Sequence, residues 1–487
     1  MDGAKESRPS LRKIRSSKAF IFTVINLAVF TDAYLYALII PVLPFALVER
    51  VQLHQDDVQR WIGILLAAYG GGLLVGSPIA AWFADRGESR QGPYLWGLIA
   101  LAASTVAFSL GQSTSVLLVG RLVQGASSAI VHTVGTAILA DTVGQAGVGP
   151  AMGFIGMSIA LGVLVGPVVG GVLYHSYGYL AVFVSGYALV ALDFLLRILM
   201  LPSPRKVNIQ ADATYGTFSH DRDNAETPPD ETQPRASRSS RPPPTSSTNP
   251  SPPPTPKEIP PTHRHPMLTL LTTPRMLAAI LADFMQSVVL TGLETILPLR
   301  IKLLFHYNSK QVALVFLVLT IPSFSAPAVG LLSDRAGAKP IVTLGFTALG
   351  PLLGLLRLVT HDSGAQVALL CALLLLIGVA LSALATPAFA EAMYVVDDAA
   401  AARPGVFGPK GAYAQAFGLM TVAYAAGSLV GPFVGGLMAE RVGWDRVTLA
   451  SGVLCGLCAL PCLYATGGRR RAVSSVGGQD SGSGMSG

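Results

Sequence analysis

Charged residues are scarce in this chain: Asp, Glu, Lys and Arg make up 13% of its 487 residues, against roughly 25% in an average soluble protein. Hydrophobic residues make up 51%. This composition excludes an ordinary soluble protein and indicates one that crosses the lipid bilayer several times. The formal charge of +7 does not indicate nucleic-acid binding, because the basic residues gather in the tails and at the ends of apolar segments.

Cysteine is also scarce, and the signatures of catalysis are missing from the sequence. Four cysteines are present, of which Cys455, Cys458 and Cys462 share one apolar segment with no further metal-ligating side chain nearby. We interpret them as packing residues of an apolar helix. The sequence contains no glycine-rich phosphate loop after a strand and no nucleotide-binding domain. We therefore expect no enzymatic activity, no cofactor and no metal site.

Glycine, by contrast, is plentiful, and one glycine pattern occurs twice. The stretch Gly153–Gly171 reads GFIGMSIALGVLVGPVVGG, and Gly418–Gly436, which begins 265 residues later, reads GLMTVAYAAGSLVGPFVGG. Both follow the pattern G-x8-G-x3-GP-x2-GG. Because six fixed residues recur in the same frame, we interpret the chain as an internal duplication.

On a helix, the glycines of this pattern fall on two sides. Gly162, Gly166 and Gly170 are spaced four residues apart and form a stripe without side chains, which allows two membrane helices to approach closely. Pro167 has no N–H group, so we expect a bend there. By spacing alone, generic glycine-rich membrane helices would look the same. The corresponding residues of the second copy are Gly418, Gly427, Gly431, Pro432, Gly435 and Gly436.

Twelve apolar segments come near the ~20 residues that a bilayer requires. They occur in two sets of six, which agrees with the duplication. The first set lies at about 19–47, 61–84, 93–111, 115–140, 151–174 and 179–201, and the second at about 276–301, 311–333, 340–360, 366–395, 412–437 and 446–466. We therefore expect an all-α membrane protein with twelve transmembrane helices in two pseudo-symmetric six-helix halves.

The chain then divides into an N-terminal tail (1–18), a first half (19–201), a linker (202–275), a second half (276–466) and a C-terminal tail (467–487). The linker is rich in Pro, Ser and Thr and cannot bury enough apolar surface to fold alone, so we expect it to be disordered. Lys and Arg gather in both tails, and an excess of these residues marks the cytosolic side of a membrane protein. We therefore expect both termini and the linker in the cytosol.

The loops after the second and eighth segments align with one another, and each contains an Asp-Arg pair. The residues concerned are Asp85, Arg86 and Arg90 in the first loop and Asp334, Arg335 and Lys339 in the second. Their recurrence at the same place in both halves favours a shared role for the two loops at the cytosolic ends of the helices. An ordinary cytosolic turn remains the alternative.

The fourth segment contains GRLVQGASSAIVHT, in which Arg121, Gln124 and His132 are the notable residues. An arginine several residues inside an apolar run is costly unless it faces a polar interior with a partner, which makes Arg121 a functional candidate. His132 follows 11 residues later, about 20° away on the same helix face. Two interpretations of His132 stay open: it extends a proton path, or local hydrogen bonds satisfy it.

Carboxylates inside apolar segments are further candidates. Asp32 lies in the first segment with Tyr36 one turn later, Asp283 and Glu294 lie in the seventh, and Glu391 lies in the tenth. An unpaired carboxylate inside a membrane would rather bind a proton than stay charged, which suits a proton carrier or the counter-ion of a cationic substrate. Asp32 is the first choice. For the other three carboxylates, a hydrogen-bond network without a role in transport is the alternative.

The sixth segment contains one more acidic residue, and it has a basic neighbour. Asp193 and Arg197 are four residues apart, so on a helix they share one face and can neutralise one another. We expect a structural ion pair here, with a gating role as the alternative.

Taken together, these motifs resemble those of the major facilitator superfamily. The repeated glycine pattern is similar to motif C, found in the fifth helix of its drug:proton antiporters. The Asp-Arg loops are similar to motif A, which latches the outward-facing state, although Ala81 replaces its leading glycine in the first copy. Arg121, Gln124 and Gly125 match the R-x-x-Q-G pattern of motif B. The resemblance implies two halves built from inverted three-helix repeats, around a midplane cavity that opens alternately to either side.

The resemblance also implies a function. Asp32 and Glu294 match carboxylates of vesicular amine transporters and their fungal drug-antiporter relatives. We expect proton-coupled antiport that exports a small amphipathic or cationic organic compound, in which protons neutralise Asp32 or Glu294 and Arg121 tunes their proton affinity. The alternatives are proton-driven uptake into a vacuole or vesicle, a facilitator or symporter, and a transporter-like sensor that moves nothing.

The expected partners follow from this function. They are a small-molecule substrate, protons and the lipid bilayer, without nucleic acid, and we expect a monomer. The plasma membrane is the favoured location, with a vacuolar or vesicular membrane as the alternative.

Overall fold

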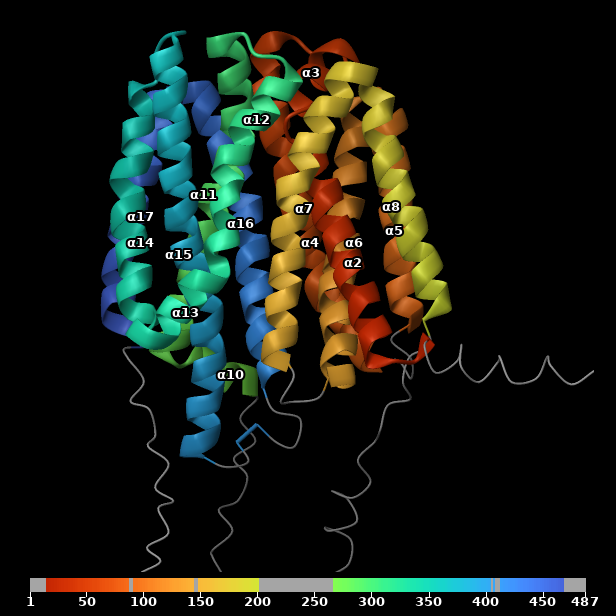
Figure 1. The fold of residues 1–487 in the computed structure, drawn as a ribbon, viewed down its shortest axis with the longest axis vertical. Coiled ribbons are helices and arrows are strands. Elements are labelled where there is room, and N and C mark those ends of the chain that lie inside the picture. The colour runs from red at the N-terminus through yellow and green to blue at the C-terminus, as the bar shows by residue number, and fades with distance from the viewer. Residues whose placement is uncertain are drawn as a thin grey trace, which may run out of the picture. The chain divides into compact units, whose positions relative to one another are not determined.

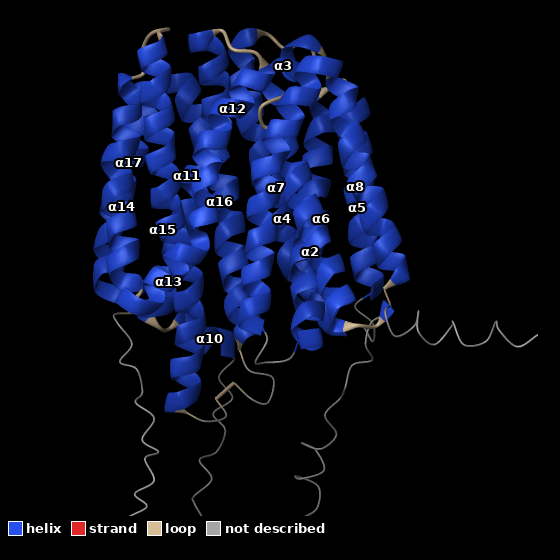
Figure 2. Ribbon diagram, viewed as in Figure 1, coloured by secondary structure: helices blue, strands red, loops and turns tan. Residues whose placement is uncertain are grey.

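The computed structural model describes residues 15–86, 91–143, 148–200, 266–403, 406–407 and 412–467. Within these ranges the chain is helical and contains no strand (Figure 2). The helices run side by side between two ends of a bundle (Figure 1). We call the end at which the first long helix begins and the last one ends the tail end. Most of the predicted linker and of both tails lies outside the described residues.

The helices form two successive groups, which we call the N-terminal half and the C-terminal half. The N-terminal half contains α2 (Lys18–Leu38), α3 (Leu43–Glu49), α4 (Gln55–Arg86), α5 (Gln91–Leu110), α6 (Thr114–Val143), α7 (Val148–Tyr177) and α8 (Tyr179–Leu199). The C-terminal half contains α10 (Pro266–Leu271), α11 (Pro274–Phe305), α12 (Ser309–Thr320), η2 (Ile321–Ser325), α13 (Ala326–Ala336), α14 (Ala338–Leu355), η3 (Leu356–Leu358), α15 (Gly364–Ala402), α16 (Tyr413–Val442) and α17 (Trp444–Ala465).

Eleven of the described helices are long and apolar enough to cross a membrane. The predicted segment 311–333 is the exception, because it consists of α12, the short 3-10 helix η2 and α13 in succession. Pro322, near the start of η2, has no N–H group and cannot continue the α-helical hydrogen bonds. Ser382 of α15 donates to the carbonyl oxygen of Pro322 at 3.1 Å. Such a bond from a neighbouring helix is how a broken membrane segment keeps its backbone satisfied.

The first predicted segment, 19–47, is likewise not one helix. α2 ends at Leu38, a turn containing Pro41 follows, and α3 begins at Leu43. Because Pro41 has no N–H group, the chain turns there. The turn ends α2 two residues after Tyr36. Asp32 and Tyr36 therefore lie in the last two turns of α2.

The glycine stripes allow the close backbone approach that the sequence predicts. A Cβ atom at Gly166 would lie 2.7 Å from the carbonyl oxygen of Tyr34 on α2. In the second copy, a Cβ at Gly427 would lie 2.5 Å from the carbonyl oxygen of Phe284 on α11. The two copies therefore play the same part: α7 packs on α2, and α16 packs on α11. Both helices continue through their prolines, and the bends expected at those prolines stay a prediction.

The last glycine of each stretch faces the other half of the protein. A Cβ at Gly171 would lie 2.5 Å from the Cβ of Ala313 on α12, and Gly436 packs against Gly63 of α4 with a Cβ-to-Cα distance of 2.9 Å. Ser309 of α12 also donates to the carbonyl oxygen of Gly171 at 3.1 Å. One face of each glycine helix thus packs within its own half, and another face forms the contact between halves.

Replacing Gly166 with leucine is expected to destabilise the protein, because the new side chain would overlap the backbone of α2. Overpacking of this kind costs about 1–3 kcal/mol. Thermal unfolding of the purified protein in detergent should show a melting temperature several degrees below that of the wild type. Gly153→Leu is the matched control, since nothing lies within 4 Å of a Cβ atom at Gly153. Equal melting temperatures for the Gly166 and Gly153 variants would contradict the packing argument.

Candidate functional site

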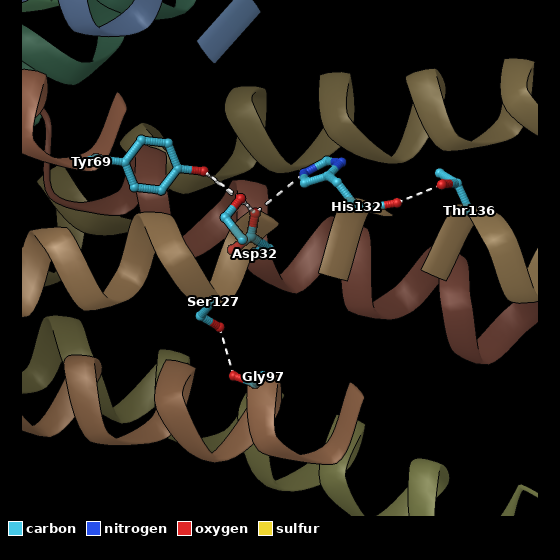
Figure 3. A network of polar contacts seen from close by, with 7 residues as sticks. Asp32, Tyr69, Gly97, Ser127, His132 and Thr136 are labelled. Atoms are coloured by element: carbon cyan, nitrogen blue, oxygen red, sulfur yellow. Dashed lines mark hydrogen bonds and ion pairs between the residues drawn. The ribbon is translucent and has the colours of Figure 1, made fainter. Parts of the chain in front are cut away.

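Asp32 lies in α2, where its side chain is 1% exposed. Its Oδ2 atom accepts a hydrogen bond from Ser128 Oγ at 2.6 Å and a long one from Tyr69 Oη at 3.5 Å. His132 Nε2 lies 3.4 Å from the same oxygen (Figure 3). The other carboxylate oxygen, Oδ1, has no protein hydrogen-bond partner within the described part of the chain. Asp32 is therefore a buried acid with one satisfied oxygen and one that is open to a further partner.

Two neighbouring helices supply these partners. Ser128 and His132 are one turn apart on α6, so both side chains reach α2 from the same face. Tyr69 comes from α4, which approaches α6 closely because Gly125 lies directly against the carbonyl oxygen of Tyr69. The sequence prediction included His132 but missed Ser128 and Tyr69. Ser128 could have been found from its place one turn before His132, whereas Tyr69 required the packing of α4.

Glu294 lies in α11 of the C-terminal half and is also 1% exposed. Tyr36 of α2 donates its hydroxyl hydrogen to Glu294 Oε2 at 2.5 Å, so this hydrogen bond joins the two halves. The Tyr36 ring in turn packs on the Tyr69 ring, with 4.4 Å between centroids. The surroundings of Asp32 and Glu294 thus meet at a pair of tyrosines.

Arg121 of α6 is buried beside this tyrosine pair. Its Nη1 donates to Gln124 Oε1 at 2.8 Å, and its Cζ lies 5.6 Å from the centre of the Tyr36 ring and 5.0 Å from that of Phe108. Cations over aromatic rings are attracted by the negative face of the ring. Arg121 also interacts electrostatically with Glu294. The arginine and glutamine predicted as a motif therefore bind one another, and they lie at the site.

Asp283 lies on α11, 11 residues before Glu294, which corresponds to about 16 Å along the helix. It is 1% exposed, and neither carboxylate oxygen has a protein hydrogen-bond partner among the described residues. Tyr424 of α16 is close enough to interact electrostatically with Asp283, Glu294 and Asp32. The sequence prediction did not include Tyr424. It lies where α16 faces all three carboxylates.

Glu391 is part of a separate network at the tail end. Its Oε1 atom lies 2.6 Å from Arg275 Nε and accepts a hydrogen bond from the backbone N–H of Gly467 at 2.8 Å. Arg275 Nη1 also binds Asp398 Oδ2 at 2.7 Å. These contacts tie the start of α11 to α15 and to the residues after α17. Of the two interpretations left open for Glu391, the geometry favours the network without a role in transport.

The predicted ion pair between Asp193 and Arg197 is not formed. Both oxygens of Asp193 lack a protein hydrogen-bond partner in the described part of the chain, and Arg197 Nη1 donates to Met200 Sδ at 3.4 Å. The guanidinium of Arg197 lies over the ring of Tyr94, 3.7 Å from its centre. Tyr94 of the neighbouring helix α5 therefore contacts Arg197 in the place of the predicted partner Asp193. Spacing along one helix does not show a contact made from another helix.

The predicted gating loops fall mostly outside what is described. α4 ends at Arg86, residues 87–90, including Arg90, lie outside the described residues, and so do the side chains of Asp85, Arg86 and Asp334. Arg335 is exposed in the last turn of α13, and the backbone N–H of Lys339 donates to the carbonyl oxygen of Gly467 at 3.2 Å. The gating role of these loops stays a prediction. In the described residues, no group of three or more His, Cys, Asp or Glu is placed to hold a metal.

The hydrogen bond between Tyr36 and Glu294 is expected to stabilise the contact between halves. In a double-mutant cycle with Tyr36→Phe and Glu294→Gln, the coupling in unfolding free energy should be about 1.5–3 kcal/mol, the range for hydrogen bonds to charged groups. The control cycle uses Tyr34→Phe and Ser185→Ala, whose hydroxyls bond at 2.7 Å within one half. That neutral pair should couple by about 0.5–1.5 kcal/mol. A smaller coupling for Tyr36 and Glu294 than for the control would contradict this interpretation.

Comparison with known proteins supplies the family. The Major Facilitator Superfamily profile matches residues 25–408. The MFS-type transporter ppzB of Metarhizium rileyi is 33% identical over 94% of this chain and 96% of its own length. The vesicular acetylcholine transporter of Torpedo marmorata is 26% identical over 44% of this chain and 47% of its own length. The crystal structure of a D-xylose-proton symporter shares the fold, with a TM-score of 0.64 and 15% identity over 93% of this chain and 98% of its own. On this evidence, the chain is a multi-pass membrane transporter that belongs to the major facilitator superfamily.

Proposed function

We propose that this transporter exchanges protons for a small cationic or amphipathic organic compound and exports it from the cytosol. The observation that carries the proposal is a pair of buried carboxylates, Asp32 and Glu294, one in each half. Tyr36 and Tyr69 connect their surroundings. When a site has one acid in each half, the binding of a proton or a cation changes both the charge of the site and the contact between the halves.

Glu294 is the acid that we assign to the cationic substrate. Its hydrogen bond from Tyr36 crosses between halves, so a cation that takes the place of this hydroxyl also loosens the contact between α2 and α11. An alternating-access transporter needs such a link between binding and the movement of its halves. Arg121 interacts electrostatically with Glu294 and stabilises its carboxylate form when the substrate is absent.

Asp32 is the acid that we assign to the proton. When a proton binds, an O–H bond forms on Asp32, and the negative charge that helps to hold a cation in the site disappears. The cation then leaves more readily, and the protonated site returns through the membrane with less charge to desolvate. His132 is 3.4 Å from Asp32 and, with a side chain 20% exposed, is the neighbour with which the acid exchanges its proton.

The relatives support a cationic substrate without identifying it. The vesicular acetylcholine transporter is named for a quaternary amine, and it resembles this chain over less than half of its length. Aromatic faces such as those of Tyr36, Tyr69 and Tyr424 suit a cation of this kind. The name of ppzB, the relative matched over most of the chain, contains no substrate.

A second candidate function has the same chemistry in another membrane. The similarity to a vesicular transporter favours proton-driven uptake of amines into a vacuole or vesicle. We propose that both termini lie in the cytosol, since the predicted tails carry the excess of basic residues. The plasma membrane is the location that goes with export from the cytosol. Fluorescence microscopy of the tagged full chain, with pH-sensitive tags at each terminus, distinguishes the two locations and reports the orientation.

Asp32→Asn is expected to abolish proton-driven transport while it preserves exchange. In proteoliposomes with an imposed pH gradient, screened with cationic amines and azole-like drugs, the wild type should accumulate substrate and move protons, because Asp32 alternates between its two protonation states. The variant should lose pH-driven accumulation by about tenfold or more, which corresponds to about 1.4 kcal/mol of coupling. Counterflow of substrate between equal pH values should persist, since no net proton movement is needed.

Asp56→Asn is the matched control for this experiment. Asp56 lies at the exposed start of α4, with a side chain 89% exposed. Its replacement should leave both accumulation and counterflow unchanged. Substrate movement by the wild type without any proton movement would overturn the antiport proposal and would favour a facilitator.

A further inference from the structure

A second polar cluster lies inside the N-terminal half, apart from Asp32 and Glu294. It consists of Tyr94 on α5 and of Asp193 and Arg197 on α8, and all three side chains are 0% exposed. The Tyr94 hydroxyl, both Asp193 oxygens, and Nε and Nη2 of Arg197 have no protein hydrogen-bond partner in the described part of the chain. Leaving a buried polar atom unpaired is unfavourable, and more so for charged groups. A purely structural ion pair would have satisfied these atoms.

This cluster adjoins the surroundings of Asp32. A Cβ atom at Gly135 of α6 would lie 3.2 Å from Tyr94 Cε2 and 3.7 Å from its hydroxyl oxygen, so Tyr94 lies against α6 at Gly135. Gly135 is three residues after His132, hence one turn away on the same face. His132 in turn contacts Asp32 (Figure 3). His132 therefore lies on α6 between Asp32 and the turn against which Tyr94 packs.

The cluster lies between Asp32 and the tail end of the bundle. Tyr94 is in the first turn of α5, which begins at the tail end, and Arg197 is in the last turn of α8, which ends there. Arg15, just before α2, donates to the carbonyl oxygen of Leu199 at the end of α8. The succession of polar groups thus runs from the middle of the bundle toward the end that we assign to the cytosol.

The charged and titratable groups that face Asp193 come from three helices. They are Arg197 on α8 itself, Tyr94 on α5 and Asp32 on α2, and each interacts electrostatically with Asp193. The other helix packed against α8 is α7, whose titratable side chains lie near the opposite end of the bundle: Tyr174, His175 and Tyr177. The charged and titratable groups that surround Asp193 are therefore Arg197, Tyr94 and Asp32.

We propose that Asp193, with Tyr94 and Arg197, forms a second proton-binding site through which protons pass between Asp32 and the cytosol inside the N-terminal half. This inference rests on the proposed proton antiport. The route runs among α2, α5, α6 and α8, whereas the contact at which Glu294 binds substrate lies between the halves. Proton and substrate then use different paths.

The proton transfers balance with water as the one further participant. An O–H bond on Asp32 breaks, His132 takes up the proton at a ring nitrogen, and Asp32 becomes a carboxylate. Because the Tyr94 hydroxyl has no protein hydrogen-bond partner in the described part of the chain, water carries the proton onward: His132 gives its proton to a water molecule beside this hydroxyl, that water gives up a proton, and an O–H bond forms on Asp193, which returns the imidazole to its neutral form. Release to the cytosol leaves Asp193 as a carboxylate, whose negative charge Arg197 compensates.

Infrared difference spectroscopy of the full-length protein in lipid vesicles tests whether Asp193 titrates, and it needs no substrate. Asp193→Asn is expected to remove one protonated-carboxyl band from the pH-dependent spectrum, and Asp32→Asn a different one. Asp56→Asn, at the exposed site, should move neither band. A spectrum in which Asp193→Asn removes no band would overturn the proposal.

Transport assays with the same variants separate this inference from the proposed function. Asp193→Asn should lower pH-driven accumulation about tenfold or more and preserve counterflow, and Asp193→Glu should restore part of the accumulation. Tyr94→Phe should slow proton movement at unchanged substrate affinity. If the wild type couples to protons and Asp193→Asn does so equally well, the second site is refuted while antiport stands. If the Asp193 band titrates but the wild type moves no protons, Asp193 binds a proton, while antiport and with it the proton route are refuted.

Discussion

The cost of keeping carboxylates inside an apolar bundle governs how this protein is built. An acid removed from water needs hydrogen bonds, a compensating charge or a proton. Asp32 obtains its bonds from Ser128 on α6 and Tyr69 on α4, and Glu294 obtains its bond from Tyr36 on α2. In both cases the hydrogen-bond donor to the acid comes from another helix. The chemistry of the site therefore depends on how closely the helices approach one another.

Glycine makes that approach possible, and it does so twice. Gly125 allows α6 to lie against the backbone of Tyr69, which brings the tyrosine hydroxyl toward Asp32. The glycine stripes of α7 and α16 hold α2 and α11, the two helices that carry Asp32 and Glu294. The acids thus lie on helices that are closely packed within their own half. A small movement of either helix changes the distance to the hydroxyls that satisfy the acid.

The buried acids of the two halves have different surroundings. In the N-terminal half, Asp193 interacts with Arg197 and Asp32, and His132 contacts Asp32. In the C-terminal half, Glu294 depends on a hydroxyl from the other half, Glu391 is bound by Arg275 at the tail end, and Asp283 has no protein hydrogen-bond partner among the described residues. This division favours proton handling inside one half and substrate handling at the contact between both.

The sequence by itself determined the helical class, the duplication and the membrane carboxylates, because these follow from apolar length, repeated spacing and the cost of charge in lipid. It also located Asp32, Tyr36, Arg121 and Glu294, whose residue types are unusual in apolar segments. Only the tertiary structure decided which side chains contact these residues. Nothing in the sequence distinguishes Ser128 and Tyr69, which packing brings to Asp32. Arg197 lies over the ring of Tyr94 and does not pair with Asp193, although Asp193 and Arg197 share a helix face. Hydrogen bonds and ring contacts between helices depend on distances that spacing along one chain does not contain.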